Sequence, residues 1–367
     1  MDYATPGNWL EAQQLGWSLH HVESLLPTAP IVRGQAGPRR FTARPSLDPA
    51  AFCAQTHTDA LLVMRGGTVL FERYFGMTAE TPHLVMSVSK SVCGMLAGIA
   101  AAAGELDLTA TTAAYVPELG PGPYGAATVT DLLDMTAVLR YDMDHTDPDS
   151  EVAAEDRAAG WRPLRPGDPA GGSRDFLRRL RHATDGAHGK TLQYSSATTE
   201  VLSWVLERAA GVPYAQLVSD RLWSLMGAEH DAYVTVDSAG TPYACAGLGM
   251  TLRDLARFGR LILDRGRYAD QQIIPADWIT QTFGGGDPAL AGDHPFREYL
   301  PGGSYHNQWW ITGYGPMYAA GLLGQYLWLD PAADVIIAKF SCIPVEADQR
   351  AAHVAGFQAI TDAVTAL

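Results

Sequence analysis

The sequence predicts an α/β plus all-α protein in which an antiparallel sheet, flanked by helices, carries an inserted helical lobe. Three observations support this. Residues 60–76 have the pattern of a β-hairpin, strand-like runs return near the C-terminus, and helical patterns fill the middle of the chain. We therefore expect residues 1–100 and 250–367 to form the lobe with the sheet, residues 101–249 to form the helical lobe, and an active site to lie between them.

The N-terminal part combines a short helix, a connection and the first hairpin. Residues 28–50 are rich in Pro, Gly and Arg and predict an extended connection, so we expect the packed fold to begin after them. In "ALLVMRGGTVLFERYFG" (60–76), two apolar runs surround Gly66 and Gly67. Glycine adopts the positive φ of a tight turn, which predicts an antiparallel hairpin. Residues 87–104 then form an apolar helix.

The rest of the chain alternates helical patterns with one long polar stretch. Helices are predicted at 128–135, 173–183, 198–211 and 251–266. Residues 141–172 are rich in polar residues, Pro and Gly, which predicts a long functional loop outside the core. The segments "YHNQWWITG" and "QYLWLDPAADVIIAKFS" predict strands, and residues 347–367 predict a covering helix.

Composition excludes several classes of function. The formal net charge is −14, so no basic face is available to neutralise nucleic-acid phosphates. The N-terminus lacks the basic and apolar regions of a secretory signal, and no apolar run reaches the ~18 residues of a membrane span. We expect a cytoplasmic protein, monomeric or homodimeric, with a small-molecule substrate and neither nucleic acid nor membrane as a partner.

Cysteine and histidine spacing indicates neither a metal nor a cofactor. Cys53, Cys93, Cys245 and Cys342 form no CxxC pair, and we expect reduced thiols. The 11 histidines include no HExxH, and the adjacent pair His20-His21 lies in a segment with no other clustered ligands.

The chemistry is concentrated in "HLVMSVSKSVCGMLAGIAAAAG" (83–104). The chain has only three lysines, and Lys90 stands among apolar residues three positions after Ser87. On a helix these two side chains are neighbours on one face. A lysine desolvated by apolar neighbours can lose its charge and become, or assist, the base that activates the serine hydroxyl. Ser-x-x-Lys at a helix N-terminus therefore predicts an acylation site.

Several motifs together resemble the serine β-lactamase and penicillin-binding superfamily, on its class C and esterase side. "MSVSKS" resembles the first motif, and Tyr194-Ser195-Ser196 in "LQYSSATTEVLSWVLERAAG" resembles the second. The resemblance covers residues 60–367 and implies a β-lactamase/transpeptidase-like fold. It implies Ser87 as nucleophile, Lys90 as proton partner and Tyr194 as general base and acid. An ordinary phenol has a pKa near 10, so a nearby Lys90 ammonium must favour the phenolate or share its proton.

The third motif departs from the family pattern. We place it at Ala319-Ala320-Gly321, where the usual Lys or His is missing. This weakens the case for substrates that need a carboxylate anchor there, including penicillins. The resemblance implies that Ala320, Gly321 and Ser196 contact substrate, and that the backbone N–H groups of Ser87 and Leu322 form an oxyanion hole.

Within this superfamily the sequence most resembles the nylon-oligomer hydrolases, in "LVMSVSKSVCG", "DPDSEVAAEDRAAGW", "QWWITG" and "GQYLWLDP". This resemblance places Asp156 opposite a free amino group of the substrate and Trp161 in a lid. His145 stands where that group has a proton-donating tyrosine, and Cys245 replaces a polar pocket residue. A plain loop histidine and a solvated aspartate remain alternative interpretations of His145 and Asp156.

These patterns predict a serine hydrolase that cleaves small linear amides or carboxylic esters through an acyl-serine intermediate. An acyltransferase that passes the acyl group from Ser87 to an amine or alcohol shares the same first half-reaction and remains the alternative. A β-lactamase, a DD-peptidase or an inactive binding homologue fits less well. An α/β-hydrolase is disfavoured because the chain has no G-x-S-x-G.

Overall fold

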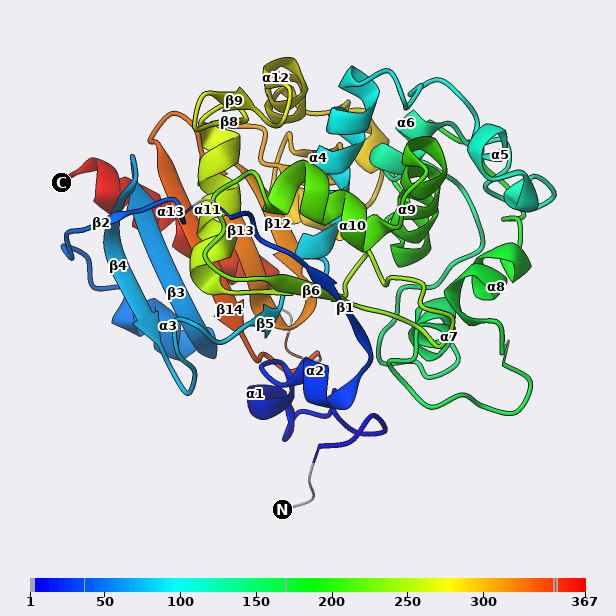
Figure 1. Cartoon of the computed structure of the whole chain (residues 1–367), viewed down its shortest axis with the longest axis horizontal. Coiled ribbons are helices and arrows are strands. Elements are labelled where there is room, and N and C mark those ends of the chain that lie inside the picture. The colour runs from blue at the N-terminus through cyan, green and yellow to red at the C-terminus, as the bar shows by residue number, and fades with distance from the viewer. Residues whose placement is uncertain (1–3, 36, 169, 346, 348) are drawn as a thin grey trace.

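An eight-stranded sheet forms the centre of the computed structural model, which describes residues 4–35, 37–168, 170–345, 347 and 349–367 (Figure 1). The strand order is β10-β11-β12-β13-β14-β3-β4-β2, and every pair is antiparallel except β2 with β4. Its strands are β2 (Thr42–Ala43), β3 (Thr58–Arg65), β4 (Thr68–Tyr74), β10 (Ser304–His306), β11 (Trp309–Ile311), β12 (Met317–Gly321), β13 (Gln325–Asp330) and β14 (Val335–Ser341). A smaller sheet has the order β1-β6-β7-β5, with β1 (Thr28–Ile31), β5 (His83–Leu84), β6 (Ala232–Thr235) and β7 (Leu248–Met250).

Helices cover both faces of the large sheet and form most of the part to its right in Figure 1. The longer ones are α4 (Val88–Ala102), α7 (Glu151–Ala158), α8 (Gly172–Arg179), α9 (Ser196–Ala210), α11 (Leu252–Leu263), α12 (Ala276–Gly284) and α13 (Arg350–Thr365). The shorter ones are α1 (Leu15–Ser18), α2 (Val22–Leu25), α3 (Ala50–Gln55), α5 (Thr112–Tyr115), α6 (Val129–Leu133) and α10 (Tyr214–Val218), and β8 (Arg267–Tyr268) pairs with β9 (Gln271–Gln272).

The predicted hairpin and the burial of the central strands follow from local rules. Gly66 and Gly67 have φ of 58° and 92°, which confirms the turn between β3 and β4. Along β3, Leu62 belongs to the core under α11, whereas Leu61 belongs to the core under α13. Because alternate residues of a strand face opposite sides, a sheet covered on both faces needs a nearly continuous apolar run.

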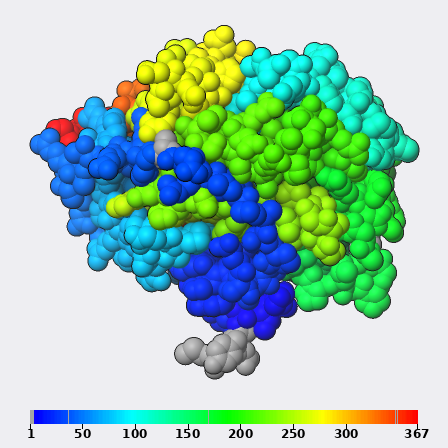
Figure 2. Space-filling view, viewed as in Figure 1, coloured from blue at the N-terminus to red at the C-terminus, as the bar shows by residue number. Residues whose placement is uncertain are grey.

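The N-terminal segment is part of the packed fold, so the expectation that packing begins after residue 50 is wrong. Trp9 and Leu15 are 1% exposed and belong to a buried cluster with Trp161. β1 pairs with β6 of the smaller sheet. Figure 2 shows the dark blue N-terminal residues at the lower centre, between the sheet part and the green helical part. Tertiary contacts, rather than local periodicity, order this Pro- and Gly-rich segment.

The prediction that 141–172 is a loop outside the core is wrong for its middle third. α7 begins after Ser150, whose hydroxyl accepts a hydrogen bond from Ala153 N. Glu155 and Asp156 on this helix are buried. Part of the polar composition that suggested a solvated loop therefore belongs to buried carboxyls, because Glu155 accepts a hydrogen bond from Tyr141 and Asp156 accepts one from Tyr243.

The structure also tests the membrane expectation. None of the helices found among the described residues has the length and apolar character needed to cross a bilayer.

Candidate active site

Ser87 and Lys90 lie together at the start of α4. Ser87 is the N-cap residue and is half-buried, whereas Lys90 is 1% exposed. The Lys90 ammonium donates to Ser87 Oγ at 2.9 Å, to Cys245 O at 3.1 Å and to Ser196 Oγ at 3.4 Å. An ammonium has three N–H groups. All three are used, so the side chain is held in one position beside the hydroxyl.

The surroundings of Lys90 favour its charged form. Burial lowers the pKa of Lys90, but the Tyr194 phenol, the Cys245 thiol and the carboxyls of Glu155 and Glu200 together outweigh burial, so the pKa lies above its ordinary value. The sequence left open whether Lys90 is itself the base. A charged Lys90 can only donate to Ser87 Oγ, so the proton of the hydroxyl must go to another group.

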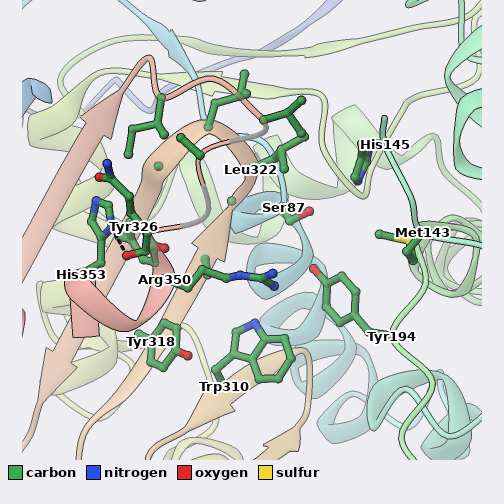
Figure 3. A pocket seen from close by; sticks show the side chains of 18 of the residues that line it. Ser87, Met143, His145, Tyr194, Trp310, Tyr318, Leu322, Tyr326, Arg350 and His353 are labelled. Carbon is green, nitrogen blue, oxygen red and sulfur yellow. Dashed lines mark hydrogen bonds between the residues drawn. The ribbon is translucent and has the colours of Figure 1, made fainter. Parts of the chain in front are cut away.

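Tyr194 lies beside Ser87 and Lys90 in the wall of the same cavity. Its ring packs nearly parallel to Trp310, at 5.5 Å between centroids, and meets Tyr305 edge-on at 5.7 Å. Lys90 Nζ lies 5.3 Å from the centre of the Tyr194 ring. In Figure 3 the phenol oxygen points toward Ser87. The aromatic contacts fix the ring in this orientation, beside the Lys90 ammonium.

A close backbone approach brings β12 to the nucleophile. A Cβ placed on Gly321 would lie 2.5 Å from Val85 O, so only glycine allows this contact. Leu322 follows Gly321 and lies beside Ser87 in Figure 3. Met86 and Leu323, each next to one of the expected oxyanion donors, have φ of 49° and 64°. Such strained conformations in residues other than glycine concentrate at functional sites.

Ser87 opens onto two adjoining cavities. The larger has a volume of about 490 Å³, and the smaller, about 60 Å³, also contacts Ser196 and Asp156. Aromatic side chains dominate the larger cavity: Tyr141, Tyr194, Tyr299, Trp310, Tyr318 and Tyr326. Arg350 of α13 extends its guanidinium into it between Trp310 and Ser87 (Figure 3). The described wall of the larger cavity is therefore mainly aromatic, with the Arg350 cation on one side.

Ala320, Gly321 and Leu322 line the larger cavity, at the end of β12 where the sequence placed the third motif. His145 lines both cavities, and burial lowers the pKa of its imidazole. A neutral imidazole can still donate one N–H toward a leaving group.

Asp156 and Trp161 line the smaller cavity but already have protein partners. The Asp156 carboxylate accepts from Tyr243 Oη at 3.0 Å and from Arg162 Nε at 3.3 Å. Trp161 is 3% exposed and donates its indole N–H to Thr235 Oγ1. The indole is therefore fixed in the wall of the cavity.

The structure does not bring the Cys245 side chain to the pocket. Among the described residues, Cys245 lines neither cavity that contains Ser87, and its thiol is fully buried. The backbone of Cys245 contacts the site instead. Cys245 O accepts a hydrogen bond from Lys90, and Cys245 N donates one to Glu200 Oε1 at 2.7 Å.

Two buried carboxyls behind Lys90 were missed by the sequence reasoning. Burial raises the pKa of Glu200 to about 8 and that of Glu155 well above its ordinary range. Tyr141 Oη donates to Glu155. No local pattern singles out Glu200, because Ser196, Ser203 and Glu207 are polar residues on the same face of its helix. Glu155 could not be identified either, because its segment was predicted to be a loop.

The family model described as Beta-lactamase matches residues 50–359. The chain belongs to the Beta-lactamase family. A 6-aminohexanoate-dimer hydrolase from Paenarthrobacter ureafaciens is 40% identical to it over 355 residues, covering 93% of this chain and 88% of that protein. A solved Bacillus anthracis structure assigned as a 6-aminohexanoate-dimer hydrolase superposes with a TM-score of 0.88 at 27% identity, covering 99% of this chain and 97% of the other.

More distant Beta-lactamase-like structures share the fold alone. EstCE1, described as a hydrolase with promiscuous acyltransferase activity, superposes with a TM-score of 0.66 at 15% identity, covering 86% of this chain and 96% of that one. The expected β-lactamase/transpeptidase-like fold is confirmed. Family membership and the 40% identical relative make this protein a serine hydrolase.

Proposed function

We propose that this Beta-lactamase family protein cleaves small linear amides or carboxylic esters through a covalent acyl intermediate on Ser87. The observation that carries the proposal is the 2.9 Å contact between Lys90 Nζ and Ser87 Oγ, with the Tyr194 phenol facing the same hydroxyl beside a 490 Å³ cavity. A nucleophile, a cation and a base thus meet at one end of a pocket large enough for an acyl group.

Acylation uses these groups in order. Tyr194 takes the proton of Ser87 as Oγ attacks the carbonyl carbon, and the Lys90 ammonium lies beside both groups. Negative charge develops on the former carbonyl oxygen, where the backbone N–H groups of Ser87 and Leu322 can donate to it. Tyr194 then returns the proton to the leaving nitrogen or oxygen as the bond to the acyl carbon breaks.

Deacylation repeats the sequence with water. Tyr194 removes a proton from a water molecule that attacks the acyl carbon, and the proton passes to Ser87 Oγ when the ester bond breaks. The cycle ends with a free acid and the starting enzyme. His145, across the cavity mouth, can donate to an amine leaving group.

The substrate class is argued from the pocket and from similarity. The 40% identical relative is named for a linear amide dimer, which supports linear amides. Asp156 is occupied by Arg162 and Tyr243, which leaves it less able to bind a free amino group. We therefore propose amides and esters with an apolar or aromatic acyl group rather than the 6-aminohexanoate dimer itself.

Intact-protein mass spectrometry tests the mechanism. The wild type mixed with p-nitrophenyl esters of increasing acyl size should gain the mass of one acyl group, located on Ser87 by peptide mapping. Ser87→Ala should not gain it. Ser91→Ala is the matched control on the same helix, because its hydroxyl donates to Gln308 O away from the pocket. Equal acylation of the wild type and Ser87→Ala would refute the proposal.

The same acyl-enzyme tests the acyltransferase alternative. Products are followed over time with and without an added primary amine. The hydrolase proposal expects free acid as the main product under both conditions. A new amide formed in preference to the acid identifies transfer as the main activity.

A further inference from the structure

A cluster of potential metal ligands lies outside the active site, where three separate segments meet. His20 lies between α1 and α2, Asp59 lies on β3, and His83 lies on β5. All three are buried, and their ligand atoms lie within 4.8 Å of one another. His83 Nε2 is 3.4 Å and His20 Nε2 is 3.8 Å from Asp59 Oδ2.

The hydrogen bonding of His83 makes the cluster chemically unusual. Its Nδ1 lies 2.7 Å from Leu84 O, and because a carbonyl can only accept, Nδ1 must carry the proton. In a neutral imidazole the lone pair is then on Nε2, which faces the Asp59 carboxylate. Two acceptors thus face each other in a buried place, and a cation between them would satisfy both.

His20 adds a third polar atom to the cluster, and this atom lacks a hydrogen-bond partner in the described part of the chain. Its Nε2 is buried and has no hydrogen-bond partner among the described residues, and its nearest charged group is Asp59 Oδ2. The rings of His20 and His83 lie 5.1 Å apart. A buried polar nitrogen without a partner is costly unless something fills the space that it faces.

Two of the three ligand separations, those from Asp59, are close to the values in four-coordinate zinc sites. Bonds of about 2.0–2.2 Å to imidazole nitrogen and carboxylate oxygen separate neighbouring tetrahedral ligand atoms by about 3.3–3.6 Å. The separation of 3.4 Å from His83 lies in this range, and that of 3.8 Å from His20 is within a few tenths of it.

Two of the potential ligands are also hydrogen-bonded to neighbouring groups, as metal ligands in proteins commonly are. Leu84 O orients His83, and the Cys342 thiol donates to Asp59 Oδ1 at 3.2 Å. In metalloproteins such partners fix the orientation of ligands and raise their basicity.

We propose that His20, Asp59 and His83 bind one first-row divalent transition-metal ion, such as Zn²⁺, with a non-protein ligand or a rearranged side chain completing the coordination. The role of the ion is structural. It ties the N-terminal segment to β3 of the large sheet and to β5, which leads directly to Ser87. The backbone already joins these segments at the same point, because Leu84 N donates to Leu19 O at 3.0 Å.

The rival explanation is a proton in place of the metal. A protonated His20 or His83 could donate to Asp59 and satisfy the cluster without an ion. The two explanations differ in a measurable quantity, the stoichiometry of tight metal binding.

The test uses the full-length protein stripped with a chelator and then dialysed against dilute ZnSO₄. We expect the wild type to retain about one zinc per chain by elemental analysis. His20→Gln should bind at least ~10-fold more weakly, because losing a ligand should cost no less than losing an outer partner, which costs 10- to 100-fold. His21→Gln is the control, since His21 is exposed and its ring contacts Trp17.

Co²⁺ provides a measurement that needs no variant. Addition of Co²⁺ to the stripped wild type should produce the visible absorption of four-coordinate cobalt, saturating at one equivalent and abolished by Zn²⁺. This spectrum decides the question if His20→Gln does not fold. Failure of the wild type to bind Zn²⁺, equal binding by wild type and His20→Gln, or no such cobalt spectrum would overturn the proposal.

Discussion

Gly321→Ala is expected to impair catalysis while leaving substrate binding nearly intact. The added Cβ would lie 2.5 Å from Val85 O and 3.0 Å from Met86 Cβ. An ordinary contact of this kind begins near 3.4 Å, so β12 or the 85–86 backbone must move by roughly 0.9 Å. Either movement separates the N–H groups of Ser87 and Leu322 that we assign to the oxyanion hole.

The size of the expected loss in kcat follows from that displacement. Misplacing catalytic groups by about 1 Å costs on the order of 100-fold in rate, and losing one oxyanion donor costs about 100- to 1,000-fold. We therefore expect kcat to fall about 100-fold, or roughly 2.7 kcal/mol in activation free energy. KM should change only a few-fold, because the walls of the cavity around the acyl group remain.

Steady-state hydrolysis of a p-nitrophenyl ester measures both constants, and thermal unfolding checks the fold. Gly284→Ala is the matched control, because no described atom outside its own helix backbone and chain neighbours lies within 4 Å of the added Cβ, and its φ is not positive. The control should keep wild-type kcat. If Gly321→Ala retains kcat within about threefold while its melting temperature is unchanged, the assignment of the Leu322 N–H to the oxyanion hole is refuted.

Three further predictions concern the base, a buried carboxyl and a helix cap. Tyr194→Phe should reduce amide hydrolysis more than ester hydrolysis, since an amine leaves only when protonated; equal losses in kcat for matched substrates would contradict its role as an acid. Burial raises the pKa of Glu200 to about 8, so the folded protein holds a proton that the unfolded chain releases above about 4.5. Stability should therefore fall as pH rises from 4.5 to 8, by up to roughly 1.4 kcal/mol per pH unit from this group. In urea titrations at pH 5 and 8, Glu200→Gln should lose less stability than the wild type, and identical pH slopes would show that the carboxyl is ionised. Thr251→Ala should lower the free energy of unfolding by about 1 kcal/mol, because Thr251 Oγ1 accepts from Asp254 N at the start of α11; urea unfolding measures this loss, and an unchanged midpoint would contradict it.

Features set by local rules could be predicted from the sequence. Gly66 and Gly67 produce the predicted turn because positive φ is an intrinsic property of glycine. Ser87 and Lys90 meet because residues three apart on a helix always share a face. Tyr194 could be placed with them only through the family motif, since 104 residues separate it from Lys90.

Features set by tertiary contacts could not be predicted in this way. The burial of Trp9 depends on Trp161 O, which accepts its indole N–H from 152 residues away. The charge on Lys90 depends on four neighbours from three other segments, which no local pattern around Lys90 reveals. The His20 cluster was missed for the same reason, because its ligands stand 39 and 24 residues apart.

The N-terminal segment is also part of what holds the reactive backbone in place. Met86 and Leu323 have positive φ, and for residues with side chains such conformations persist only where packing enforces them. Both side chains are buried in the cluster that contains Trp9 and Leu19 from the N-terminal segment. This packing offsets the strain at two residues that adjoin Ser87 and Leu322, whose N–H groups we assign to the oxyanion hole. If that assignment is right, residues more than 60 positions before Ser87 help to set the geometry of the proposed oxyanion hole, and a loosened N-terminal segment should lower kcat without contacting the substrate.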